Sequence, residues 1–172
     1  GALFRLVPRH PQRFEAAAQL LKESGLPFVR RSEIREAGDC SSSAVRAAQS
    51  VVVLLGDTVG EMVRHYASSQ VAIIGGSFAP LGGQNLIEAC AVGVPVIVGP
   101  HTHNFEQAVN DAIHEGAALR AQNADAALQL ALLLLEASRR LAQMGEAGEN
   151  WVRQHAGAVQ RVMDGYLALR GP

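Results

Sequence analysis

The sequence predicts an α/β fold with a mostly parallel sheet, and three observations lead to this prediction. Short apolar runs alternate with segments of helical periodicity along most of the 172 residues. The run at residues 51–55 contains only valine and leucine, which is typical of a strand buried on both faces. The runs at 51–55, 71–74 and 95–98 end directly in glycine. Alternation of this kind favours a Rossmann-like, three-layer domain, with helices on both faces of the sheet.

The first half of the chain is predicted to hold three strands and two helices. We expect strands over the apolar runs at residues 3–7, 27–31 and 51–55, and a polar loop over residues 32–49. A helix is expected over residues 14–24, where apolar residues recur at helical spacing until Gly25 ends the pattern. Thr58 is placed to N-cap a helix over residues 59–66, with Glu61 at the capping-box position.

The second half continues the alternation and ends in helices. We expect strands over residues 71–74 and 95–98, and an edge strand over 117–120. We expect helices over residues 84–91, 104–114, 124–145, 146–155 and 158–169. Asn104 can cap the second of these helices and Gly116 can end it. The whole chain, residues 1–172, is therefore expected to form a single nucleotide-binding type of domain.

Composition narrows the class of protein. Fifteen basic and sixteen acidic residues give a net charge of −1, so charge offers no argument for a nucleic-acid partner. The longest apolar run, residues 130–135, is far shorter than the roughly 20 residues of a membrane-spanning helix. No secretory signal pattern opens the chain, so a soluble fragment is expected. Cys40 and Cys90 are too few for a zinc motif or a disulfide framework, which indicates a reduced, cytoplasmic protein.

Residues 71–105 point most directly to a function. They run through strand, glycine loop, helix, strand and polar loop, and ligands bind at the carboxyl ends of such strands. The pair Gly82-Gly83 precedes the helical segment, so backbone N–H groups there can approach an anion closely. Asn85 and Glu88 are three residues apart on one helix face, where a carboxylate can accept hydrogen bonds from ribose hydroxyls. This pattern predicts a nucleotide or sugar-phosphate site.

Several alternative chemistries are disfavoured by the same residues. No G-x-G-x-x-G follows the first strand and no P-loop motif occurs, which argues against NAD, FAD and P-loop NTPases. Ser77 lies close to a G-x-S-x-G elbow, but Pro80 and the glycine pair interrupt the turn into a helix. His101 and His103 lack a third metal ligand nearby. We therefore expect no metal, no cofactor and no catalytic residue in this chain.

Four motifs occur in order along the chain. They are Val7-Pro8-Arg9-His10-Pro11, Gly56-Asp57-Thr58-x-Gly60-Glu61, Gly75-Gly76-Ser77 with Gly82-Gly83-x-Asn85-x-x-Glu88, and Gly99-Pro100-His101-Thr102-x-Asn104-Phe105. Together they resemble the C-terminal half of the 3-deoxy-D-manno-octulosonic acid (Kdo) transferases, GT-B glycosyltransferases of lipopolysaccharide assembly. The resemblance covers residues 3–169. Gln84 stands where that family usually has His, and His103 where it usually has Phe.

The resemblance implies an enzyme of two Rossmann-like domains with different roles. In the family, an N-terminal domain binds the lipid A precursor and supplies a glutamate base, and the C-terminal domain holds the donor CMP-Kdo. Transfer inverts the anomeric carbon without a bound metal. This chain would then be the donor half, without the N-terminal acceptor domain, and inactive alone. The full enzyme is expected at the cytoplasmic face of the inner membrane.

The expected donor site combines the residue patterns with the family motifs. Its members are Pro8, Arg9, His10, Gly56, Asp57, Thr58, Gly75, Gly76, Ser77, Gly82, Gly83, Gln84, Asn85, Glu88, His101 and Asn104. Arg9 suits a phosphate because its guanidinium forms paired hydrogen bonds. Two alternatives stay open, a UDP-sugar-using GT-B enzyme or epimerase and a non-catalytic nucleotide-binding module. Nothing in the composition distinguishes cytosine from uracil.

Overall fold

The computed structural model describes residues 3–34 and 53–170, the last of these, 156–170, by backbone alone. The chain divides into two compact units, Gly1–His65 and Tyr66–Pro172. Most of the polar loop expected over 32–49, and the start of the strand expected over 51–55, lie outside the described residues. A single domain over the whole chain stays a prediction.

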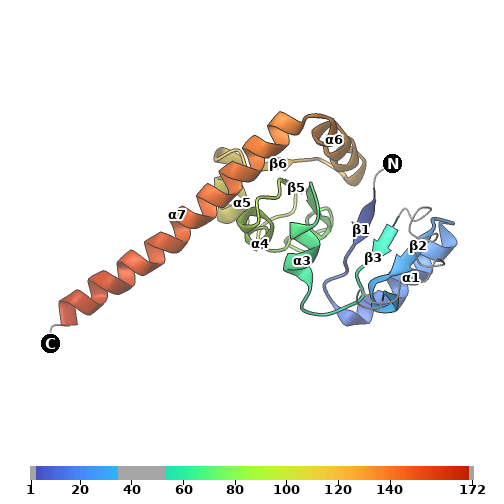
Figure 1. The fold of residues 1–172 in the computed structure, drawn as a ribbon, viewed down its shortest axis with the longest axis horizontal. Coiled ribbons are helices and arrows are strands. Elements are labelled where there is room, and N and C mark those ends of the chain that lie inside the picture. Colours follow the sequence, from blue (N-terminus) through green and yellow to red (C-terminus); the bar gives the residue numbers. More distant parts are fainter. Residues whose placement is uncertain (1–2, 35–52, 171–172) are drawn as a thin grey trace. The chain divides into compact units, whose positions relative to one another are not determined.

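The first unit contains a three-stranded parallel sheet (Figure 1). Its strands are β1 (Phe4–Leu6), β2 (Phe28–Arg30) and β3 (Val53–Leu55), and β3 pairs with both others in the order β1-β3-β2. Helix α1 (Phe14–Glu23) packs Ala18 and Leu21 against Val53 and Leu55 of the central strand. Short 3-10 turns follow β1 and β2, at Pro11–Arg13 and Arg31–Glu33. Helix α3 (Met62–Ala67) runs across the division of the chain.

The second unit also contains a three-stranded parallel sheet, with its strands in the order of the chain. Strands β4 (Ala72–Ile74), β5 (Val96–Val98) and β6 (Ala118–Arg120) are parallel, in the order β4-β5-β6. The remaining elements are a 3-10 turn, Gly75–Ser77, and helices α4 (Ile87–Ala91), α5 (Glu106–His114), α6 (Ala124–Glu136) and α7 (Ser138–Arg170). Because every ladder is parallel, the loops after β4, β5 and β6 leave the sheet at one edge.

Strand β5 shows why this unit has three layers. Its three residues are fully buried, and alternate side chains enter two different clusters. Val96 and Val98 pack with α4, α5 and Trp151 of α7, whereas Ile97 packs with α6 and Met144 of α7. The prediction of an α/β fold with a parallel sheet between helices is confirmed.

The C-terminal helices differ from the prediction. A break falls at Ala137, and α7 then runs through Gly145 and through residues 155–158, where we expected ends (Figure 1). A Cβ on Gly145 would overlap the Gly93 carbonyl, and one on Gly148 would lie 3.2 Å from the Cys90 carbonyl oxygen. These glycines therefore permit close packing of α7 on α4 and do not end the helix.

Two of the predicted caps are wrong. Helix α3 begins at Met62, three residues after the expected start at Val59, and the Thr58 hydroxyl donates to the Glu61 carboxylate. Helix α5 begins at Glu106 without a side-chain cap, and the Asn104 amide donates to the Leu81 carbonyl. The Thr58 side chain bonds a neighbour three residues along the chain, whereas the Asn104 side chain bonds a residue distant in sequence.

The predicted helix ends at two glycines are confirmed. Gly25 and Gly116 follow the C-caps of α1 and α5 with φ of 68° and 81°. Asn123, which precedes α6, accepts a 2.8 Å hydrogen bond from the Ala126 N–H as its N-cap.

Candidate functional site

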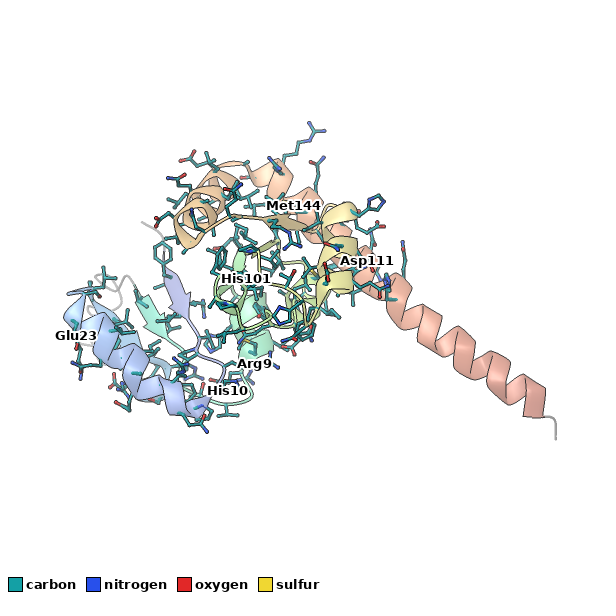
Figure 2. The ribbon with its side chains drawn as sticks, turned by 180° about the vertical axis from the view of Figure 1, so that it is seen from behind. Arg9, His10, Glu23, His101, Asp111 and Met144 are labelled. Carbon is teal, nitrogen blue, oxygen red and sulfur yellow. The ribbon has the colours of Figure 1, made fainter. Side chains whose placement is uncertain are left out.

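The loop after β1 exposes two polar side chains. Pro8 is half-buried. Arg9 and His10, which are labelled in Figure 2, are both exposed. Neither side chain forms a hydrogen bond or ion pair with another described residue, although the His10 carbonyl accepts from the Arg13 N–H that starts the next turn. Both side chains are therefore available to a ligand at the carboxyl end of this strand.

The loop after β3 is tied to the loop after β2 through Asp57. The Asp57 side chain is 4% exposed and accepts hydrogen bonds from the Ser32 N–H (2.9 Å) and hydroxyl (2.7 Å). The Arg30 guanidinium lies 3.6 Å away. Burial disfavours the charged carboxylate, but the Ser32 hydrogen bonds and the Arg30 charge outweigh it and hold the Asp57 pKa below its ordinary value. Asp57 thus joins two strand ends.

Thr58 takes part in a second link of the same kind. Its hydroxyl donates to the Glu61 carboxylate, which also pairs with Arg31 at 2.9 Å and with Arg64 at 3.5 Å. The Thr58 hydrogen bond, followed by the Arg31 pairing, lowers the pKa of Glu61. Thr58 and Asp57, both predicted to contact the donor, therefore already have partners within the first unit.

Gly56, in the same loop, packs closely against neighbouring residues. Its N–H donates to the Leu6 carbonyl at 2.8 Å, which joins β3 to the end of β1. A Cβ at this position would lie 2.9 Å from the His65 ring nitrogen and 3.0 Å from Val7. Only glycine fits here without a shift of these neighbours.

In the second unit, Ser77 cross-links the loops after β4 and β5. Its side chain is fully buried, and its hydroxyl donates to the Ile74 carbonyl while accepting from the Gly99 N–H at 2.6 Å. The Ser77 carbonyl accepts from the His101 N–H at 2.9 Å. A hydroxyl buried in this way is unsuited to act as an exposed nucleophile.

The glycines around Ser77 differ in the space they leave. Gly75 is exposed, and a Cβ there would meet nothing within 4 Å, so its backbone faces open space. At Gly76 a Cβ would lie 3.4 Å from the Gln84 side chain. Gly82 has φ of 85°, and a Cβ there would overlap the Asn104 amide. Gly75 is thus the position at which a ligand can come closest to the backbone.

The predicted geometry at the start of α4 is wrong in one respect. Gly82 and Gly83 both have positive φ and precede the helix, which begins only at Ile87. The Asn85 side chain accepts a 2.9 Å hydrogen bond from the Ile87 N–H, so Asn85 lies in a turn before the helix. The shared helix face proposed for Asn85 and Glu88 therefore does not form. Glu88 is in the first turn, half-buried, with no side-chain partner among the described residues.

The loop after β5 combines an exposed and a buried side chain. His101, which is labelled in Figure 2, is exposed. Thr102 is only 5% exposed. The Asn104 N–H donates to the Gly82 carbonyl at 3.1 Å, and its amide reaches Leu81 at 3.2 Å. Asn104 therefore fixes the glycine loop against this one, and His101 is left free to meet a ligand.

Arg120 is a functional candidate that the sequence did not reveal. It ends β6, and its guanidinium donates to the Gly99 carbonyl (3.0 Å), the Thr102 hydroxyl (3.2 Å) and the Asn110 amide oxygen (3.3 Å). The strand expected over 117–120 offered one signal, a basic residue at its carboxyl end. Only the sheet order places that end beside the loop after β5.

The described residues contain neither a metal-binding cluster nor a membrane-spanning helix. Among the described residues, no group of three or more His, Cys, Asp or Glu side chains could hold a metal ion. No helix in the described part of the chain is long and apolar enough to cross a bilayer. Cys90 is fully buried, and burial raises the pKa of its thiol to about 11, so the thiolate form is disfavoured at neutral pH.

Comparison with known proteins identifies the class. The family model of the group 1 glycosyl transferases matches residues 38–151, and the chain therefore belongs to that family. Its curated relatives include Kdo transferases, as the motifs predicted. It is 53% identical over 162 residues to the 3-deoxy-D-manno-octulosonic acid transferase of Bordetella pertussis, and 34% identical over 163 residues to that of Haemophilus influenzae. These alignments cover 94% of this chain but only 36% of each relative.

A solved structure gives the same relationship in three dimensions. The chain is similar to the crystal structure of the C-terminal CMP-Kdo binding domain of WaaA from Acinetobacter baumannii, with a TM-score of 0.76 and 32% identity. The match covers 87% of this chain and 73% of that domain. The fold is thus that of the C-terminal half of a GT-B glycosyltransferase.

Proposed function

We propose that this chain is the CMP-Kdo-binding half of an inverting glycosyltransferase that transfers Kdo to a lipid A precursor. The observation that carries the proposal is the similarity to a CMP-Kdo binding domain over most of both chains. The chain spans 36% of the length of its transferase relatives, so an acceptor-binding domain is expected to complete the enzyme. We further propose that the full enzyme works at the cytoplasmic face of the inner membrane.

The proposed donor contacts are the groups that the fold leaves without an internal partner. In the first unit they are Arg9 and His10. In the second they are the side chains of Glu88 and His101. Gly75 is added because it is exposed and has open space beside its backbone, although its carbonyl accepts from the Phe78 N–H. An arginine can bind a phosphate through paired charge-assisted hydrogen bonds, and a carboxylate can accept from ribose hydroxyls. Asp57, Thr58, Ser77 and Asn104 would act by holding these loops in place.

The division of chemistry follows from the kinds of side chain present. Departure of CMP leaves negative charge, which an arginine and backbone N–H groups can stabilise without a metal. The proposal leaves the general base to the acceptor-binding domain. This chain would bind and orient the donor and stabilise its leaving group.

The experiment that tests this proposal is a titration of the chain with CMP, UMP and UDP, followed by NMR amide shifts. We expect CMP to bind best, with shifts at the loops after β1, β4 and β5. Arg9→Ala and Glu88→Ala should each weaken CMP binding about tenfold, because each removes a charged hydrogen-bond partner. Arg153→Ala and Glu136→Ala, which alter exposed side chains on α7 and α6, are the controls.

Two results would contradict the proposal. Tighter binding of UMP or UDP would favour a UDP-sugar enzyme. Two patterns of CMP-induced chemical-shift change would contradict the assigned residues. One is changes located away from the strand ends, and the other is changes of the same size in the wild type and in both site variants.

A further inference from the structure

We propose that Arg120 is a positioning residue that holds the loop of residues 99–104 in its donor-binding conformation. Arg120 is the last residue of β6, and β6 lies beside β5 in the sheet. Its guanidinium spans two points of the neighbouring loop, the Gly99 carbonyl and the Thr102 hydroxyl, at 3.0 and 3.2 Å. This inference rests on the proposed function and adds a residue that no family motif includes.

The loop that Arg120 contacts connects the proposed ligand groups of the second unit. The Gly99 N–H donates to the Ser77 hydroxyl and the His101 N–H to the Ser77 carbonyl, so the loop fixes the turn beside Gly75. The Asn104 N–H donates to the Gly82 carbonyl. A shift of this loop would therefore move His101 and the backbone near Gly75 together.

The chemistry of the contacts explains why the residue is an arginine. The planar guanidinium offers several donors in a fixed fork and can reach Gly99, Thr102 and Asn110 together, which a lysine ammonium cannot do with the same geometry. Gly99 and Thr102 are both buried. Removal of the guanidinium leaves the buried Gly99 carbonyl without this donor, and the loss favours movement of the loop.

The charge of Arg120 also fits a place beside an anion. All three of its acceptors are uncharged oxygens, and no ion pair between described residues includes it. Its positive charge is therefore not neutralised by a carboxylate of the described chain. This fits a loop that receives a phosphate-bearing ligand.

The test compares Arg120→Met, Arg120→Lys and the control Arg153→Met. Arg153 lies on α7 and bonds Asn150 at 3.0 Å, so its loss removes a similar contact elsewhere. The first measurement is amide hydrogen exchange at Gly99, His101 and Asn104, which needs no ligand. The second is CMP affinity by NMR titration, and the third is the melting temperature.

We expect Arg120→Met to speed exchange at these three amides and to weaken CMP binding, each by about tenfold, as for the loss of two net hydrogen bonds. Arg120→Lys should fall between Arg120→Met and the wild type. Arg153→Met should change neither quantity.

Three results would overturn the inference. They are unchanged exchange in Arg120→Met, faster exchange throughout the β4-β5-β6 sheet with a matching fall in melting temperature, and faster loop exchange with unchanged CMP affinity. If the wild-type chain bound no CMP, the proposed function and the donor-site role of Arg120 would both fail. The exchange data would still decide whether Arg120 holds the loop.

Discussion

At the scale of single residues, polar side chains at the strand ends divide into two groups. Asp57, Thr58 and Ser77 form hydrogen bonds within the protein. The Asp57 and Ser77 bonds join one strand-end loop to another, and Thr58 bonds the Glu61 carboxylate that pairs with Arg31. Arg9 and Glu88 have no such partner among the described residues. Side chains of the first group give the loops their shape, and those of the second are free to meet a ligand. Substitutions in the first group should therefore lower stability, and substitutions in the second should weaken ligand binding.

Asp57→Asn should reduce stability through the first group. It removes the charge that accepts two Ser32 hydrogen bonds and lies beside Arg30, and the loss should be about 1.5–3 kcal/mol for hydrogen bonds to a charged group. The Asp57 pKa is lower in the folded state, so this stabilisation is present above the unfolded pKa of about 4 and disappears as the pH falls through the folded value.

Urea unfolding at pH 7 and at successively lower pH measures this effect. The difference in the free energy of unfolding between the wild type and Asp57→Asn should be largest at neutral pH and should become smaller in acid. Asp111→Asn, on α5, is the control (Figure 2). A difference that stays constant as the pH falls through this range would show that the Asp57 charge is not responsible.

At the scale of elements, a glycine can end a helix or lie inside one, and tertiary contacts decide which. Gly25 and Gly116 have positive φ and follow helix ends, as the pattern predicted. Gly145 and Gly148 lie inside α7, because α4 approaches too closely for a larger residue. The two cases look alike in a single sequence, which is why the predicted helix end near Gly145 was wrong.

Gly145→Ala provides a test at this scale. Alanine is the better helix former by about 1 kcal/mol, so an unpacked helix would be stabilised. Here the new Cβ would overlap the Gly93 carbonyl, and we expect a net loss of stability. In Gly148→Ala the new Cβ would lie 3.2 Å from the Cys90 carbonyl oxygen, which is tight but not an overlap. This substitution should therefore reduce stability less than Gly145→Ala. Fluorescence of the single tryptophan, Trp151, which is buried in this unit, follows the unfolding. Stabilisation by Gly145→Ala would contradict the close approach.

At the scale of the whole molecule, the proposed function makes this chain one part of a larger enzyme. It spans 36% of its curated relatives and matches a donor-binding domain over most of its length. We expect no Kdo transfer from CMP-Kdo to a lipid A precursor by this chain alone, since the proposed base lies in the other domain. A transfer assay beside the full-length enzyme checks this, and turnover by the isolated chain would contradict the proposed division of roles.

The sequence by itself determined the α/β class, the order of strands and helices, and the family. Apolar runs that end in glycine reflect the preferences of residues near one another in the chain. The four ordered motifs can likewise be found in the sequence without knowledge of tertiary contacts. Only the tertiary structure decided which polar residues at the strand ends are already bonded. It also moved the start of α4 to Ile87 and brought Arg120 to the loop after β5. The physical reason is that these outcomes depend on neighbours distant in sequence, which supply the hydrogen-bond partners and the close contacts.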